Sequence, residues 1–188
     1  MPYPAKLSPD AVLAAARRLL ETSGPAALTM RALAETLDVR PSSLYRHFEN
    51  RETLLAELGE QAARTLDETL QAATRGKSPR PALLAAADAY LNYARQHPHL
   101  YALLLIPGPE RTAQELAASA GKQLWNTLLA LVGAVSGDPD DTAHTVALWT
   151  FLHGFSELER CGIFGASGPR GGLEAGLEAL LNHMTLRA

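Results

Sequence analysis

The spacing of apolar residues along the chain predicts a protein built from helices. Alanine and leucine dominate the apolar residues, β-branched residues are few, and no segment alternates apolar and polar residues as a strand does. The first apolar stripe follows Ser8-Pro9-Asp10, in which a serine can cap the helix, a proline suits its first turn and an acid complements its positive end. The pattern therefore predicts an all-α fold with about nine helices.

Residues 28–48 predict two short helices separated by a tight turn. Thr29 is placed to cap the first of them, and Asp38 tolerates the backbone geometry of a turn better than most residues other than glycine. Pro41 suits the start of the second helix, in which only Leu44 and Phe48 are large and apolar. With the helix that precedes them, these elements predict a three-helix helix-turn-helix domain over residues 1–51.

The remaining residues, 52–188, predict a second, larger helical domain. A fourth helix, capped by Asn50, is expected to continue to about Thr74 and to link the two domains. His97-Pro98-His99 interrupts the helical pattern. Four longer helices are expected at about 79–96, 110–135, 140–162 and 173–184.

The helix expected at 140–162 is apolar around much of its circumference. Such a helix is usually buried on several sides, and in a chain of 188 residues one of those sides is expected to face a second copy of the protein. With the last helix, it predicts a four-helix dimer interface of two helices from each subunit. The predicted interface residues are Ala147, Phe151, Gly154, Phe155, Leu158, Leu177, Leu180 and Leu181.

Charge and cysteine content narrow the choice of partner and compartment. Net charge is −3, yet residues 1–51 hold seven basic and five acidic residues, so a polyanion is expected to meet the N-terminal domain. The single cysteine, Cys161, allows no intramolecular disulfide and fits a reducing cytoplasm. No apolar run approaches the ~18 residues of a membrane span, and we expect a soluble intracellular protein.

The segment LTMRALAETLDVRPSSLYRHFENRETLL, residues 28–55, resembles the tetracycline-repressor (TetR) family of bacterial one-component transcription regulators. QHPHLYALLL at 96–105 and ALWTFLHGFSELE at 147–159 resemble a regulatory domain named for its Trp-His-Gly residues. The resemblance covers nearly the whole chain. Asp38 departs from the family pattern, which commonly has glycine in the turn, and we expect that backbone to be tolerated.

This resemblance implies that the third helix enters the major groove of operator DNA. Arginine offers bidentate donors to guanine, and serine can contact bases or phosphates. The residues implied for base edges are Arg40, Ser42, Ser43 and Arg46, and those for phosphates are Thr29, Arg31, Tyr45, His47 and Arg51. Pro41 either touches a thymine methyl group or simply starts the helix.

The resemblance further implies a homodimeric repressor of a palindromic operator, released when a small molecule tilts the fourth helix. Dimers of this kind read half-sites about one helical turn apart. The residues expected to line the ligand chamber are Tyr90, Tyr93, Tyr101, Trp125, Trp149 and His153. The protein is expected in the bacterial cytoplasm, at the nucleoid when bound to DNA, with no cofactor, metal or membrane partner.

Plainer interpretations stay open beside these. Residues 40–47 could form an ordinary solvated helix, and the aromatic residues of the larger domain could be core. His97 and His99 make a weak metal pair, Cys161 lacks a second cysteine in the chain, and the acidic turn at 138–141 fits helix capping better than calcium binding. A helix-turn-helix protein that binds constitutively or answers to a protein partner is the alternative function. The chain shows no nucleophile–base pairing and no phosphate-cradling glycine loop, so an enzyme is not expected.

Overall fold

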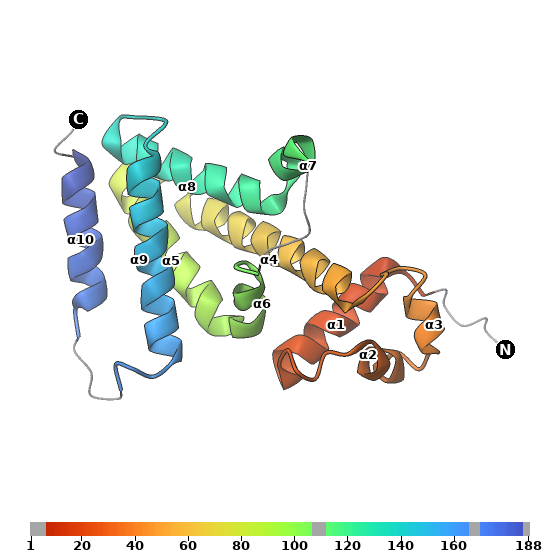
Figure 1. Ribbon diagram of the computed structural model, residues 1–188. Coiled ribbons are helices and arrows are strands. Elements are labelled where there is room, and N and C mark those ends of the chain that lie inside the picture. Colours follow the sequence, from red (N-terminus) through yellow and green to blue (C-terminus); the bar gives the residue numbers. More distant parts are fainter. Residues whose placement is uncertain (1–6, 107–111, 166–169, 186–188) are drawn as a thin grey trace. The chain divides into compact units, whose positions relative to one another are not determined.

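The computed structural model describes residues 7–106, 112–165 and 170–185, and within these ranges all regular secondary structure is helical (Figure 1). The described residues form ten helices and no strand, which confirms the all-α prediction. None of these helices is both long and apolar enough to cross a membrane.

The described helices are numbered in chain order. Their bounds are α1 Pro9–Ser23, α2 Met30–Thr36, α3 Pro41–Leu44, α4 Arg51–Thr74, α5 Pro79–Gln96, α6 Pro98–Leu103, α7 Ala113–Ala118, α8 Ala120–Ser136, α9 Thr142–Arg160 and α10 Gly172–Thr185. The expected ends of α4 and α5 agree with these bounds.

The chain forms two compact units. The first comprises Met1–Ala63 with His97–Thr112, and the second comprises Arg64–Gln96 with Ala113–Ala188. Helix α4 contributes residues to both units, and α6 belongs to the unit that holds the helix-turn-helix. The functional boundary after residue 51 stays a prediction.

The first unit is built around a leucine core. Leu20, Leu28, Leu33, Leu44 and Leu54 come from five consecutive parts of the chain and are fully buried together. Burying each such side chain stabilises the unit by roughly 1.5–3 kcal/mol before the entropy cost is counted. This cluster holds α1, α2, α3 and the start of α4 together.

Short polar side chains define where the first helices begin. The N–H of Ala11 donates to the Ser8 hydroxyl at 3.2 Å, and that of Ala32 donates to the Thr29 hydroxyl at 3.1 Å. Both predicted caps are therefore confirmed. Asp38 adopts a left-handed backbone with φ of 52°, the only described residue other than glycine with a positive φ, as the tight turn requires.

Helix α6 is held against α1 by the carboxylate of Glu21. The Leu100 N–H donates to Glu21 Oε1 at 3.0 Å, and His97 Nδ1 lies 3.4 Å from Oε2. Leu100 and Leu103 are buried in the same core cluster. The proline-broken turn thus starts a new helix, and an acid satisfies the free N–H of Leu100 in its first turn.

The second unit packs α5, α8, α9 and α10 against one another. An ion pair between Arg95 and Glu159, 2.7 Å apart, joins α5 to α9 on the surface. The single helix expected at 110–135 is wrong, because the chain forms two helices that break at Ser119. This residue has an extended backbone, and its hydroxyl accepts from the Lys122 N–H at 3.2 Å, so it caps α8.

A chain of hydrogen bonds joins the start of α9 to α10. Asp141 caps α9 by accepting from the His144 N–H at 3.1 Å, and its other oxygen lies 2.6 Å from His144 Nδ1. His144 Nε2 then lies 2.8 Å from His183 Nδ1 on α10. The capping role predicted for the acidic turn is thus confirmed for Asp141.

This corner is expected to make stability depend on pH. Burial acts to raise the pKa of Asp141, but hydrogen bonds from the His144 N–H, its ring and Ser136 outweigh it and hold the pKa below its usual 3.8. A lowered folded pKa contributes stability that is present above the unfolded pKa and is lost as the pH falls through the folded value. Urea unfolding should therefore show that wild type has a higher free energy of unfolding than Asp141→Asn. This difference should be constant above about pH 5 and should shrink below about pH 4. A difference that stays constant in acid would contradict the assignment.

Gly133 lets α8 approach the turn that follows it. A Cβ at this position would lie 2.7 Å from the carbonyl oxygen of Asp138 and 3.0 Å from the Cα of Pro139. Both are backbone atoms, so relief requires the turn to move. Gly133→Ala is expected to lower the free energy of unfolding by about 1–3 kcal/mol, measured by urea denaturation.

Gly121, on the same helix, is the matched control because a Cβ there meets no atom within 4 Å. Gly121→Ala is expected to leave stability unchanged or to raise it by up to about 1 kcal/mol. Similar effects of the two substitutions would show that the close approach at Gly133 is unimportant.

Candidate nucleic-acid interface and ligand site

Helix α3 contacts the core through one buried residue, and its other side chains form a polar face. Leu44 is its only buried residue, and Phe48 in the following turn is 6% exposed. Tyr45 between them is 53% exposed, and the side chains of Arg40 and Arg46 also lie on the surface. The phase of the helix therefore turns cationic and aromatic groups outward, as a nucleic-acid contact requires.

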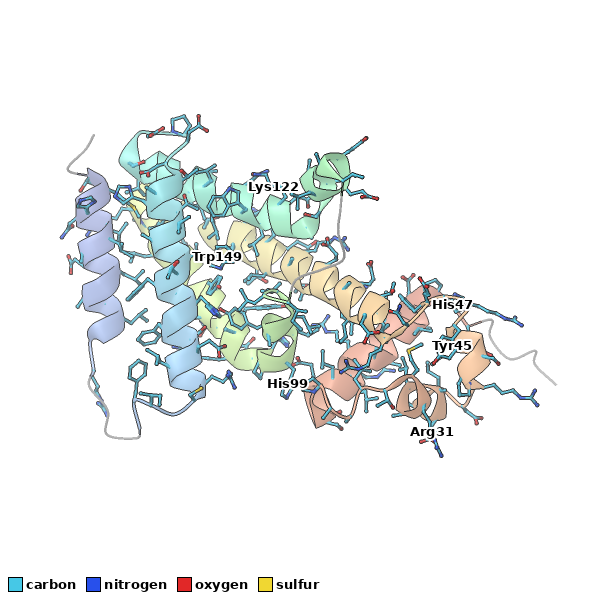
Figure 2. All side chains as sticks on the ribbon, in the orientation of Figure 1. Arg31, Tyr45, His47, His99, Lys122 and Trp149 are labelled. Atoms are coloured by element: carbon cyan, nitrogen blue, oxygen red, sulfur yellow. The ribbon has the colours of Figure 1, made fainter. Side chains whose placement is uncertain are left out.

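The structure places all ten residues predicted for DNA contact on the first unit. Figure 2 shows Tyr45 and His47 beside α3 and Arg31 on α2. The exposed members are Thr29, Arg31, Arg40, Pro41, Ser42, Tyr45 and Arg46, and the half-buried members are Ser43, His47 and Arg51. Their contacts with DNA stay predictions.

Arg31 lies on the outer side of α2 with its guanidinium near an acid. Its Nε donates to Glu35 Oε1 at 3.1 Å, one turn along the helix, and both side chains are mostly exposed. Exposed pairs of this kind contribute little stability, on the order of 0.3–0.5 kcal/mol. A phosphate could therefore replace Glu35 as the partner at small cost.

Arg51 has a role that the sequence did not indicate. Its Nε donates to the carbonyl oxygen of Leu28 at 2.6 Å, and its Nη2 donates to that of Pro25 at 2.7 Å. These bonds join the first residue of α4 to the loop before α2. No local pattern marks a contact between residues more than twenty positions apart.

Three of the six residues predicted for the ligand chamber meet in the second unit. Trp149 Nε1 on α9 donates to the hydroxyl of Tyr90 on α5 at 3.1 Å. The ring of Trp125 on α8 meets that of Trp149 edge to face, with centroids 6.2 Å apart. Tyr90 is buried and the two tryptophans are half-buried. Three helices thus bring aromatic groups and two polar tips to one place, as a pocket of this kind needs.

The other three chamber residues are placed differently. Tyr93 is buried on α5, and His153 is half-buried one turn after Trp149. Tyr101 is buried on α6, which belongs to the first compact unit. A shallow hollow on α8 and the next turn is lined by none of the six predicted residues. The assignment of Tyr93, Tyr101 and His153 to a chamber stays a prediction.

The residues predicted for the dimer interface divide between the interior and the surface of the second unit. Phe151 packs its ring against Gly176 of α10, and lies 6.4 Å from the ring of Phe155. Leu177 and Leu181 are buried within the subunit. The half-buried members are Ala147, Phe151, Gly154, Phe155 and Leu180, and Leu158 is 45% exposed. A partner would meet mainly the members that reach the surface.

Two family models match the chain. Residues 12–58 match "Bacterial regulatory proteins, tetR family", and residues 83–184 match "Tetracyclin repressor-like, C-terminal domain". The chain belongs to the TetR family and is a helix-turn-helix transcriptional regulator. The Trp-His-Gly type of regulatory domain stays a prediction.

Curated relatives agree over most of the chain. The HTH-type transcriptional regulator Rv0681 of Mycobacterium tuberculosis is 31% identical, covering 85% of this chain and 73% of its own. The class A tetracycline repressor from transposon 1721 in Escherichia coli is also 31% identical, over 97% of this chain and 92% of its own.

Solved structures share the fold. BioQ bound to its double-stranded DNA operator is 25% identical, with a TM-score of 0.58 over 95% of this chain and 98% of its own. A TetR variant of Acinetobacter baumannii bound to minocycline is 23% identical, with a TM-score of 0.68 over 97% of this chain and 99% of its own. The second likeness concerns the fold alone.

Proposed function

We propose that the protein is a homodimeric repressor in the bacterial cytoplasm that binds a palindromic operator and is released by a small molecule. Its task is regulation rather than catalysis. The observation that carries the proposal is the exposed, polar and cationic surface of residues 40–46, which Leu44 and Phe48 hold on the leucine core. The fold is shared with BioQ, whose structure contains its operator DNA.

Control by a ligand rests on the second unit. Tyr90, Trp125 and Trp149 converge from three helices, and a relative over nearly the whole chain is a tetracycline repressor. A TetR of the same fold was solved with minocycline. These observations favour a small-molecule effector over the alternative of constitutive or protein-controlled binding. Titration of candidate ligands into the protein–operator complex separates the two, since only the first predicts release.

Dimerisation rests on apolar surface that one subunit leaves open. Val146 and Leu158 on α9 are 49% and 45% exposed, and a Cβ at Gly154 would meet no atom within 4 Å. A second copy covering this face would bury these groups and bring two operator-reading heads to neighbouring half-sites. Sedimentation velocity is expected to give twice the chain mass of 20.1 kDa. A monomer at micromolar concentration would contradict this part of the proposal.

Arg46→Ala tests the reading role of α3. An arginine that makes a bidentate contact with a guanine contributes about 1–3 kcal/mol of discrimination between bases, so affinity for the operator should fall at least tenfold. A change at the contacted base pair should then cost the variant less affinity than it costs wild type. The measurement is fluorescence anisotropy at fixed salt, with a duplex selected from a random library.

Arg64→Ala provides the control, because this exposed arginine on α4 lies in the second unit. It removes the same charge and is expected to leave operator affinity within about twofold, the size of a small surface effect. Equal losses for Arg46→Ala on the operator and on unrelated duplexes would make Arg46 a phosphate contact instead.

A further inference from the structure

Asp67 is a buried acid with one oxygen that has no hydrogen-bond partner. The residue lies on α4 in the second unit and is only 7% exposed. Gln71 Nε2, one turn along the helix, donates to Oδ2 at 2.9 Å. Among the residues that the structure describes, Oδ1 of Asp67 is the one buried side-chain oxygen or nitrogen without a partner.

Asp67 sits where the apolar and polar sides of its helix meet. Leu66 and Leu70, at positions i−1 and i+3, are both fully buried, whereas Glu68 and Gln71 are exposed. Asp67 itself is buried, and Gln71 donates to only one of its two carboxylate oxygens. The other oxygen is left without a partner inside the protein.

An unpaired oxygen in this position costs stability. Leaving a buried acceptor unsatisfied costs about 1–3 kcal/mol, and more when the group carries charge. A leucine of similar size would fill the site without that cost. Buried polar groups that destabilise the free protein are typical of binding sites, where the missing partner arrives with the ligand.

We propose that Asp67 is the residue that selects the effector, and that the effector is an apolar molecule carrying an amine. This assignment rests on the proposed ligand control and names its chemistry. An ammonium group supplies the N–H donors that Oδ1 lacks, and its charge complements the carboxylate. The second unit, which holds Asp67, also contains the Tyr90–Trp149–Trp125 cluster, whose aromatic rings suit an apolar body.

An amine is favoured over other ligand classes because Asp67 Oδ1 is a hydrogen-bond acceptor that lacks a donor. A carboxylate ligand would place two acceptors together and is excluded by repulsion between like groups. A hydroxyl can donate one hydrogen bond without charge, and a bond that involves a charged partner is roughly twice as strong. The site is therefore expected to bind the amine most tightly, the alcohol less tightly and the acid least tightly.

The ligand test uses phenylbutylamine, phenylbutanol and phenylbutyrate, which share one apolar body. Binding is followed by tryptophan fluorescence, since both tryptophans of the chain, Trp125 and Trp149, lie in the second unit. Wild type is expected to bind the amine at least about tenfold more tightly than the alcohol. In Asp67→Asn, which keeps the shape, that ratio should fall to about one. No binding of the amine, an equal affinity for the alcohol, or a ratio unchanged in Asp67→Asn overturns the assignment.

A second test needs no ligand. Asp67→Leu removes the unsatisfied oxygen, so the melting temperature of the free protein is expected to rise. The matched control is Asp88→Leu on α5, because Asp88 also accepts from an amide one turn along, Asn92 Nδ2 at 3.1 Å, but is exposed. That substitution should leave the melting temperature nearly unchanged. A fall for Asp67→Leu would make the carboxyl a structural group and overturn the assignment.

The two proposals fail in different ways. Release of the operator by phenylbutyrate but not by the amine would keep the ligand-controlled repressor and discard the role of Asp67. Tight, Asp67-dependent binding of the amine by a protein that binds no selected duplex would keep the role of Asp67 and discard the repressor.

Discussion

Leu44→Ala is expected to lower the free energy of unfolding by about 2–5 kcal/mol and to abolish operator binding. Leu44 is fully buried and is the only buried residue of α3, a helix of four residues. Its loss leaves a cavity where α2, α3 and α4 meet the core, and nothing else on α3 replaces the contact. Urea unfolding and anisotropy on the selected duplex measure the two effects.

Tyr45→Ala, one residue along, separates anchoring from contact. Its side chain is 53% exposed, so stability should change by less than about 0.5 kcal/mol. Operator affinity should still fall, because the residue is predicted to contact phosphate, and the loss should be similar for all DNA sequences. If Tyr45→Ala destabilised the protein as much as Leu44→Ala, the division of α3 into an anchor and a reading face would be wrong.

Trp149→Ala is expected to cost about 3 kcal/mol of unfolding free energy and to remove the response to a ligand. The indole joins three helices of the second unit through its bond to Tyr90 and its contact with Trp125. Circular dichroism should follow unfolding, since the substitution removes one of two fluorescent reporters. DNA binding at a temperature where the variant is folded should persist, because α3 belongs to the other unit.

Trp149→Phe is the control that keeps an aromatic ring in place of the indole. It removes the hydrogen bond to the Tyr90 hydroxyl and one of the two fused rings, so its cost should be about 1–2 kcal/mol, less than that of Trp149→Ala. A loss in Trp149→Phe as large as in Trp149→Ala would show that an aromatic ring at this position is not enough to hold the cluster. Full retention of the ligand response in Trp149→Ala would remove Trp149 from the chamber.

Local chemistry explains which parts of the fold could be predicted from the sequence. Caps at Ser8 and Thr29 depend on atoms three residues away, and the left-handed backbone of Asp38 depends on one turn. The helix-turn-helix follows from such short-range signals together with the period of its leucines. The outward face of α3 follows in the same way, because Leu44 and Phe48 determine its phase.

What the sequence could not supply depends on contacts between distant residues. The break at Ser119 lies within an apolar pattern that continues through it, so the periodicity alone favours one helix. Asp67 has the spacing of any acid on a helix, and only the packed structure reveals its unpartnered oxygen. The meeting of His144 with His183 joins residues 39 positions apart, which no window of local sequence spans.

The hydrogen bonds of Arg51 to the loop before α2 have a consequence for chain entropy. Residues 28–51 form a loop that the guanidinium closes at its two ends, and that loop contains α2, the turn and α3. Closing a loop of about two dozen residues restricts their conformations at an entropic cost of roughly 3 kcal/mol. This entropy is lost when the unit folds, so it is not lost again when the protein binds DNA. The elements that meet the operator are therefore arranged in advance. Because one planar guanidinium holds the two carbonyl oxygens in fixed directions, lysine, with a point charge on a flexible stem, is not an equivalent replacement.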